Sequence, residues 1–278
     1  MGDTLSGAVA TSAFLAFVAL PVSILVTNSL FFPDPRAWNW RYSVTMLRAH
    51  GVALLALLAM LVPQNIQAAL DPAFTAALPW RDAPTAFIAS YEGGFHEWLQ
   101  AIPGRAILQP SLAFVYLVGF PYIIISTTAI SVWRNDGVRA RRAATAYALC
   151  YAFALPFYLF LPVNEVWFHI DPNNGGSVQQ LALHYPIVRE SLYAFNEINN
   201  CFPSLHTGIS VAMALVARGV PRFGTFAAVW ASLIVFSTMY LGIHWVTDVV
   251  AGIILAILMV RLAKRIWPDA PAAAAPAT

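Results

Sequence analysis

Two short stretches in the last third of the chain carry the side chains that could do chemistry. Residues 201–206 (CFPSLH) end in a histidine, and residues 237–248 (STMYLGIHWVTD) contain a histidine followed four residues later by an aspartate. Residues four apart share one face of a helix, so we expect Asp248 to reach the His244 ring from one turn away. The carboxylate would fix the tautomer and leave the other ring nitrogen free to attack an electrophile. With His206 handling the leaving-group proton, these side chains suit covalent catalysis at a phosphorus centre.

The first stretch also has the features of an anion site. Pro203 suits the first turn of a helix, because its missing N–H costs nothing there. The backbone N–H groups of Ser204, Leu205 and His206 would then point out of a helix N-terminus, where anions bind readily. The Ser204 hydroxyl could add a hydrogen bond to a phosphate oxygen. The plainer interpretation is a serine cap beside an interfacial histidine, and for the second stretch it is a buried His–Asp hydrogen bond.

Composition indicates the surroundings of these residues. Of 278 residues, 59% are hydrophobic and 10% are charged, against roughly 25% charged in soluble domains. With a mean hydropathy of +0.67, the chain is predicted to be an all-α polytopic membrane bundle. A net charge of +2 without a basic stripe argues against a nucleic-acid partner. Cys150 and Cys201 have no metal-ligand spacing, so we expect two buried thiols and no metal or other cofactor.

Apolar runs of spanning length recur along the chain, and we expect about seven transmembrane helices. They are placed at about 5–32, 45–62, 108–133, 143–163, 204–217, 225–241 and 245–262. The fifth is short for a bilayer, as expected of a helix that begins at a polar site. Residues 1–266 would form a single membrane domain with a catalytic core at about 143–262, followed by a disordered tail at 267–278.

Two outer connections remain, at about 63–107 and 164–203. The first contains the aromatic segments 86–91 and 95–99, which predict an interfacial helix. The second becomes helix-like from 178 to 198. Both connections lie on the side of the two histidine motifs.

Basic residues predict the orientation in the membrane. With these spans, 12 of the 15 basic residues fall on one side: Arg36, Arg41, Arg48, Arg134, Arg139, Arg141, Arg142, Arg218, Arg222, Arg261, Lys264 and Arg265. The other side has Arg81, Arg105 and Arg189. Cytoplasmic loops carry the excess of Lys and Arg, so we expect a plasma-membrane protein whose histidine motifs lie on the extracytoplasmic face.

The two stretches resemble the second and third signature motifs of the phosphatidic acid phosphatase type 2 superfamily, P-S-G-H and S-R-x5-H-x3-D. The match runs through Pro203, Ser204, His206, Ser237, His244 and Asp248. The resemblance covers about residues 143–262. It implies that His244 becomes phosphohistidine, that Asp248 orients it, and that His206 is the general acid and base.

The sequence also departs from that pattern. The first family motif, K-x6-R-P, is absent, and residues 162–167 stand where it should fall. Thr238 replaces the arginine of the third motif, and Leu205 replaces the glycine of the second. The pattern with F-P-S-L-H and S-T-x-Y-L looks more like the branch typified by fungal inositol phosphorylceramide synthase. Members of that branch move a phospho-headgroup from a phospholipid to a lipid alcohol.

The small number of basic residues near the two motifs also favours a phospholipid diester as the donor. A phosphomonoester carries nearly two negative charges near neutral pH, and sites for it normally supply guanidinium or ammonium groups. A phosphodiester carries one charge and is better matched to hydroxyls, helix N–H groups and one protonated histidine. The opposing interpretation is that Arg189 folds back to replace the missing arginines.

We therefore expect a lipid phosphotransferase in the bilayer, with a membrane phospholipid as donor and a lipid alcohol as candidate acceptor. Its expected substrate-binding residues are Ser204, Ser237, Thr238, Tyr240, Arg189 and Asn164. The main alternative is a phosphatase for phosphatidate or polyprenyl phosphate, in which water replaces the alcohol. A transporter or structural protein would need the two motifs to be coincidental. A metal hydrolase stays open, because two histidines and an aspartate could ligate zinc.

Overall fold

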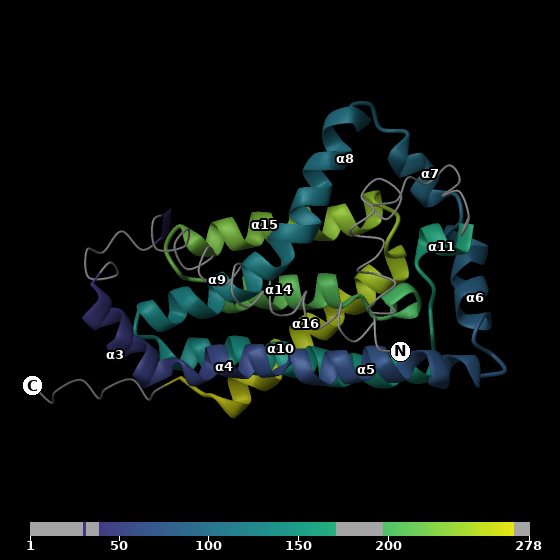
Figure 1. The fold of residues 1–278 in the computed structure, drawn as a ribbon. Coiled ribbons are helices and arrows are strands. Elements are labelled where there is room, and N and C mark those ends of the chain that lie inside the picture. The colour runs from purple at the N-terminus through teal and green to yellow at the C-terminus, as the bar shows by residue number, and fades with distance from the viewer. Residues whose placement is uncertain (1–29, 32–38, 171–196, 270–278) are drawn as a thin grey trace, which may run out of the picture.

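The protein is a bundle of helices. The computed structural model describes residues 30–31, 39–170 and 197–269, and Figure 1 shows the helices packed side by side. The described part contains no strand, only one parallel bridge between Val163 and Asn200. The all-α prediction is therefore confirmed for these residues.

Residues 171–196 lie outside the described part, and the described elements are helical throughout. They are α3 (Trp40–His50), α4 (Val52–Ala59), α5 (Leu61–Ala76), α6 (Ala83–Glu92), α7 (Phe95–Gln100), α8 (Arg105–Phe114), the π-helix η3 (Val115–Gly119), α9 (Phe120–Trp133), α10 (Gly137–Phe160), α11 (Val166–Ile170), the 3-10 helix η4 (Glu197–Asn199), α14 (Leu205–Ala217), α15 (Phe223–Tyr240) and α16 (Val246–Ile266).

Five helical stretches are long and apolar enough to cross a membrane. They are Val52–Ala76, Arg105–Trp133, Gly137–Phe160, Phe223–Tyr240 and Val246–Ile266. The apolar helix α14 has 13 residues, matching the short span that we predicted. The count of seven is not confirmed, because the first predicted span lies outside the described residues apart from residues 30–31.

One predicted boundary is wrong. We expected an outer connection to begin at Pro63, but α5 continues as a helix to Ala76. Pro63 lies in the first turn of α5, where a proline is tolerated. The polar residues that follow are matched against α10: the Gln64 amide donates to the Tyr147 hydroxyl at 2.6 Å, and the Tyr151 hydroxyl donates to Gln67 Oε1 at 3.3 Å.

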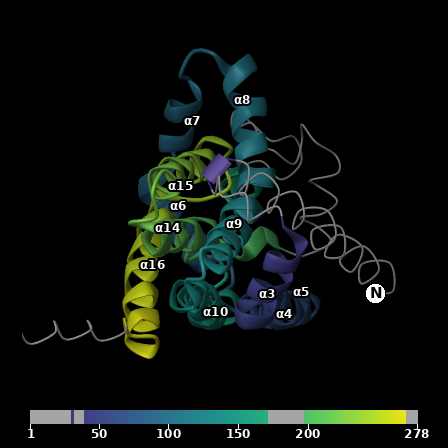
Figure 2. The same cartoon turned by 90° about the vertical axis from the view of Figure 1, so that its left-hand side faces the viewer.

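Helix α14 lies at the centre of the bundle. It packs against α9, α10, α15 and α16, and these helices surround it when the bundle is turned by 90° (Figure 2). Helices α15 and α16 meet at the hairpin 241–245 and diverge away from it, each resting on α14 (Figure 1). Small residues allow the closest crossing, where the Gly208 and Gly252 backbones of α14 and α16 approach one another.

The two ends of the bundle differ in character. The turns after α9 and α14 and the end of α16 carry Arg134, Arg218 and Lys264. The hairpin, α6, α7 and α11 lie at the opposite end (Figure 1). At the basic end, Arg142 donates to the Trp267 carbonyl at 2.8 Å and pairs with Asp269 at 2.9 Å. The rest of the predicted tail, 270–278, lies outside the described residues, as does most of the predicted helix 178–198.

Candidate active site

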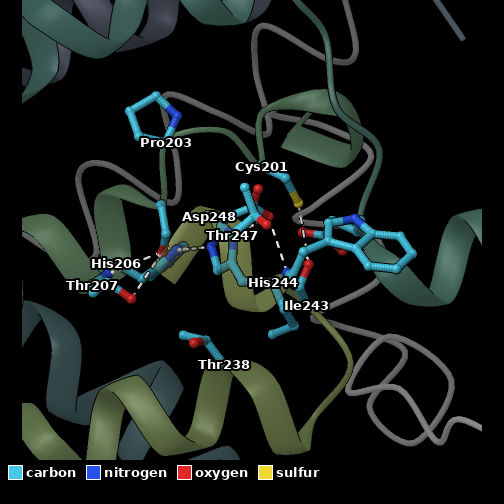
Figure 3. A network of polar contacts seen from close by, with 12 residues as sticks. Cys201, Pro203, His206, Thr207, Thr238, Ile243, His244, Thr247 and Asp248 are labelled. Carbon is cyan, nitrogen blue, oxygen red and sulfur yellow. Dashed lines mark hydrogen bonds and ion pairs between the residues drawn. The ribbon is translucent and has the colours of Figure 1, made fainter. Parts of the chain in front are cut away.

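The structure brings the three predicted catalytic side chains together. Nδ1 of His206 lies 3.3 Å from Nε2 of His244, and Nδ1 of His244 lies 3.6 Å from Oδ2 of Asp248 (Figure 3). Asp248 is fully buried, and the His244 side chain is buried as well. The row His206, His244, Asp248 therefore places one partner on each nitrogen of the central ring.

His244 is held by a hairpin and not by a helix, which corrects our reason for its contact with Asp248. Gly242, with φ of 74°, makes the turn after α15. The carbonyl of Thr238 accepts the N–H groups of Ile243 at 2.9 Å and His244 at 3.1 Å. Asp248 stands in the first turn of α16, and its Oδ2 also accepts the Trp245 N–H at 3.0 Å. The carboxylate thus folds back over the helix N-terminus toward the ring.

This geometry defines the protonation of the site. A carboxylate beside Nδ1 favours the tautomer of His244 that carries its proton there. The lone pair on Nε2 can then accept the Nδ1 proton of His206. Burial lowers the pKa of His244 to about 3, against the opposing effect of a hydrogen bond to the Cys201 backbone. The ring is consequently neutral near pH 7 and nucleophilic at Nε2.

Ser204 joins α14 and α16, the helices that carry His206 and Asp248. It is the N-cap of α14, where its hydroxyl accepts the Thr207 N–H at 3.2 Å and lies 3.1 Å from Thr207 Oγ1. Its own N–H donates to the Asp248 carbonyl at 3.1 Å. One of the three N–H groups that we expected to face an anion is therefore used to tie α14 to α16. Pro203 precedes the cap and lies outside the first turn, and its carbonyl accepts the Tyr158 hydroxyl at 2.9 Å.

The other predicted substrate residues lie around the hairpin. The hydroxyls of Ser237 and Thr238 donate within α15, to Ile234 at 2.7 Å and Val235 at 2.8 Å. The Asn164 carbonyl accepts the Trp245 indole N–H at 2.9 Å. Arg189 lies outside the described residues.

Tyr240 packs in an apolar cluster with Leu99 and Tyr116. Its buried hydroxyl has no hydrogen-bond partner among the described residues.

Comparison with known proteins gives the family of this site. Residues 86–262 match the family model described as "PAP2 superfamily". The chain belongs to the PAP2 superfamily. This membership supports a phosphatase or phosphotransferase that acts on lipids. Because the match begins in α6, the shared region extends well before the 143–262 range that we inferred from the motifs.

A relative gives no further functional detail. An uncharacterized protein of Methanocaldococcus jannaschii, MJ0662, is 27% identical over 174 residues, which cover 62% of this chain and 67% of that protein. No solved structure matches the chain significantly.

Two aromatic side chains beside His206 could not be identified from the sequence. The Tyr116 and Phe120 rings lie 4.6 Å and 4.5 Å from the His206 ring, measured between centroids. They come from η3 and the start of α9, a stretch that reads as an ordinary apolar span. A π-turn inside a helix is frequent at functional sites, but the sequence gives no simple signal of one. The two rings pack against the His206 side chain.

An apolar groove runs along the outside of α14 and α15. It has a volume of about 830 Å³ and lies between α14 and α15, with Ile253 of α16 at its side. At the hairpin end it reaches Met239, the residue after Thr238, and at the other end it reaches Arg218 and Arg222. Its lining is mostly apolar, which suits a hydrocarbon chain.

The potential metal ligands do not form a convincing zinc site. Among the described residues, a ligand atom each from Cys201, His244 and Asp248 lies within 4.8 Å of the others, and His206 is not in this group. The Cys201 thiol donates to the Ile243 carbonyl at 3.1 Å, and burial raises the pKa of this thiol. Because zinc needs the thiolate form, these residues fit the metal poorly.

Proposed function

We propose that this PAP2 protein cleaves a lipid phosphate ester through a phosphohistidine on His244 and transfers the phospho-headgroup from a phospholipid to a lipid alcohol. The observation that carries the proposal is the arrangement around one ring. Nε2 of His244 points to His206, while Nδ1 faces Asp248. This is the order that a histidine nucleophile needs, with an orienting carboxylate behind it and a proton donor in front.

In the first step, the Nε2 lone pair attacks phosphorus and the bond to the ester oxygen breaks. The departing oxygen takes a proton from His206, which must be protonated at that moment. A bound phosphate anion favours the charged form of a nearby histidine. In the second step, the acceptor hydroxyl gives its proton to His206 and attacks the phosphohistidine, so that His244 is regenerated.

In this mechanism the described arrangement corresponds to the site before substrate enters. At 3.3 Å, Nδ1 of His206 lies where a group bonded to His244 Nε2 would extend. His206 must therefore turn or shift when the phosphate enters. This movement gives up the contact with His244 Nε2 and slides the imidazole along the neighbouring rings of Tyr116 and Phe120.

The groove supports a lipid as substrate. Helix α15, which forms one wall, has 18 residues and is therefore about 27 Å long. This length is close to the roughly 30 Å hydrocarbon core of a bilayer. A phospholipid whose chain lies in the groove has its polar end at the level of the hairpin.

The choice of a diester donor rests on charge. Thr238 stands in place of the family arginine, and residues 162–167 contain no basic residue. Each missing charge-assisted hydrogen bond is worth about 1.5–3 kcal/mol, and a dianion would lose more than a monoanion. Hydrolysis of a phosphomonoester is the second candidate, favoured if Arg189 supplies the lost guanidinium.

We also propose that the site faces the extracytoplasmic side of the plasma membrane, because the basic end of the bundle is opposite to the hairpin. A cysteine introduced at Asn174 should react with an impermeant thiol reagent added outside cells. Labelling from the cytoplasmic side alone would reverse this orientation.

The function is tested by following the products of purified protein. We expect a phospholipid diester to be turned over with a higher kcat/KM than the matched phosphatidate, and a long-chain alcohol to receive the headgroup. His244→Ala should abolish both turnover and the covalent phosphoenzyme. Faster hydrolysis of phosphatidate that collapses in Arg189→Ala would favour the phosphatase, and full activity of His244→Ala would refute the mechanism.

A further inference from the structure

The N-terminus of α16 lacks an acceptor from its own N-cap residue. The first N–H groups of a helix need acceptors, which a Ser, Thr, Asp or Asn side chain at the N-cap usually supplies. Here the N-cap is Trp245, whose indole is only a donor. The helix that carries Asp248 therefore depends on acceptors from elsewhere.

Glu92, the last residue of α6, supplies them. Its carboxylate accepts the N–H of Val246 at 2.6 Å, the N–H of Thr247 at 2.9 Å, and the hydroxyl of Thr247. Glu92 is only 9% exposed, so little water competes for these bonds. The Tyr91 hydroxyl lies 3.0 Å from Thr247 Oγ1 and extends the same contact.

Helix α7 holds the end of α15, on the other side of the hairpin. The His96 ring bonds through Nδ1 to the Met239 carbonyl at 3.1 Å, and the Gln100 amide donates to the Tyr240 carbonyl at 2.6 Å. The His96 ring also lies edge-on to Trp245, 5.7 Å between centroids. Thus α6 fixes the start of α16 and α7 fixes the end of α15, with His244 between them.

We propose that Glu92 is a positioning residue that holds the Asp248 carboxylate against His244 by capping α16 from outside. The residues that it binds, Val246 and Thr247, directly precede Asp248. A carboxylate at this point is also favoured by the positive end of the helix dipole. Loss of the cap would let the first turn of α16 unwind, and Asp248 would then no longer stand 3.6 Å from Nδ1 of His244.

The kinetic part of this inference rests on the proposed function, so the test adds a readout that does not. Glu92→Ala and Glu92→Gln are compared with Asp82→Asn, a charge removed from the other end of α6. The Asp82 side chain is 81% exposed and makes no capping bond. Amide hydrogen exchange at Val246 and Thr247 is measured in detergent, together with kcat and KM.

In Glu92→Ala we expect faster exchange at both amides and a fall in kcat of about tenfold to hundredfold, because an error of about 1 Å at a reacting group costs up to about 10²-fold. KM should change little, since Glu92 does not touch substrate. Glu92→Gln keeps one acceptor oxygen and should recover part of the loss, and Asp82→Asn should behave as wild type. If Glu92→Ala does not fold, the glutamine variant provides both readouts.

Three results would overturn the inference. Unchanged exchange at Val246 and Thr247 would show that Glu92 does not cap α16, whatever reaction the protein performs. Faster exchange with unchanged kcat would show a cap that does not position Asp248. A raised KM with unchanged kcat would place Glu92 in substrate binding. If the wild type acts on no lipid phosphate while exchange still rises in Glu92→Ala, the cap stands and the proposed function fails.

Discussion

Replacing Gly252 by alanine should push α16 away from α14, the helix that carries His206. A Cβ at this position would lie 2.6 Å from the Ser204 carbonyl oxygen, 3.0 Å from Cβ of Thr207 and 3.2 Å from the Gly208 nitrogen. The first of these falls about 0.8 Å short of the 3.4 Å at which ordinary contact begins. The Ser204 carbonyl cannot give way easily, because it is backbone and accepts the Gly208 N–H at 2.8 Å.

The separation of α16 from α14 acts directly on the contact between His206 and His244. Gly252 lies one turn after Asp248 on α16. The atoms that its Cβ would meet belong to Ser204, Thr207 and Gly208, which flank His206 on α14. A separation of this size would lengthen the 3.3 Å contact between His206 and His244. Misplacement by about 1 Å can cost about 10²-fold in rate, and overpacking costs about 1–3 kcal/mol of stability. We expect kcat to fall by tens of fold, with KM nearly unchanged and a lower Tm.

The assay is lipid turnover in mixed micelles, with thermal unfolding measured on the same preparations. Gly94→Ala is the matched control, since a Cβ there meets nothing within 4 Å. Gly252→Ala protein that folds and keeps the kcat of Gly94→Ala would refute the argument that the helix crossing sets the distance between the two histidines.

Three further predictions concern the chemistry of the site. Asp248→Asn should leave the fold intact, because the amide oxygen can still accept the Trp245 N–H. Its kcat should fall on the order of 10³–10⁴-fold, because the amide favours the wrong tautomer of His244. A folded variant whose kcat is within tenfold of wild type would contradict this. Burial lowers the pKa of His244 to about 3, whereas the unfolded ring has a pKa near 6.5. As pH falls through this window the unfolded state binds the proton first and the native state loses stability. The advantage of wild type over His244→Asn in unfolding free energy should therefore shrink from pH 7 to pH 4.5, and a constant difference in denaturant titrations would disprove the burial argument. Activity should survive metal chelators; a loss that zinc restores would instead assign Cys201, His244 and Asp248 to a metal.

Much of the site could be predicted because its chemistry is local in the sequence. His244 and Asp248 are four positions apart in the sequence, and Gly242 marks the turn that lets the chain reverse. The helix pattern gave the wrong reason for that contact, since His244 lies before the N-cap of α16. What the spacing predicts is proximity, and both a helix and a capped hairpin satisfy it. The hydroxyls of Ser237 and Thr238 show the limit of the approach, because their bonds to α15 carbonyls depend on rotamers that residue types do not specify.

The boundary error at α5 has a related cause. Polar residues such as Gln64 and Gln67 look like the beginning of a loop when the chain is considered one segment at a time. They are helical because Tyr147 and Tyr151 of α10 supply their partners. In a bilayer a polar group needs such a partner, and pairing across helices is not visible in the hydropathy of either helix alone.

The contribution of α6 and α7 could not be read from the catalytic motifs, although it determines how they are held. Glu92 is 154 residues from Val246 in sequence, and the segment around it has the composition of an interfacial helix. Its role follows from a deficit in the motif itself: the residue before α16 is a tryptophan, which cannot accept the free N–H groups of the helix. Such a deficit near a buried aspartate implies an acceptor elsewhere in the fold. The family match, which begins at residue 86, includes Glu92, as expected if the cap and the catalytic hairpin form one unit.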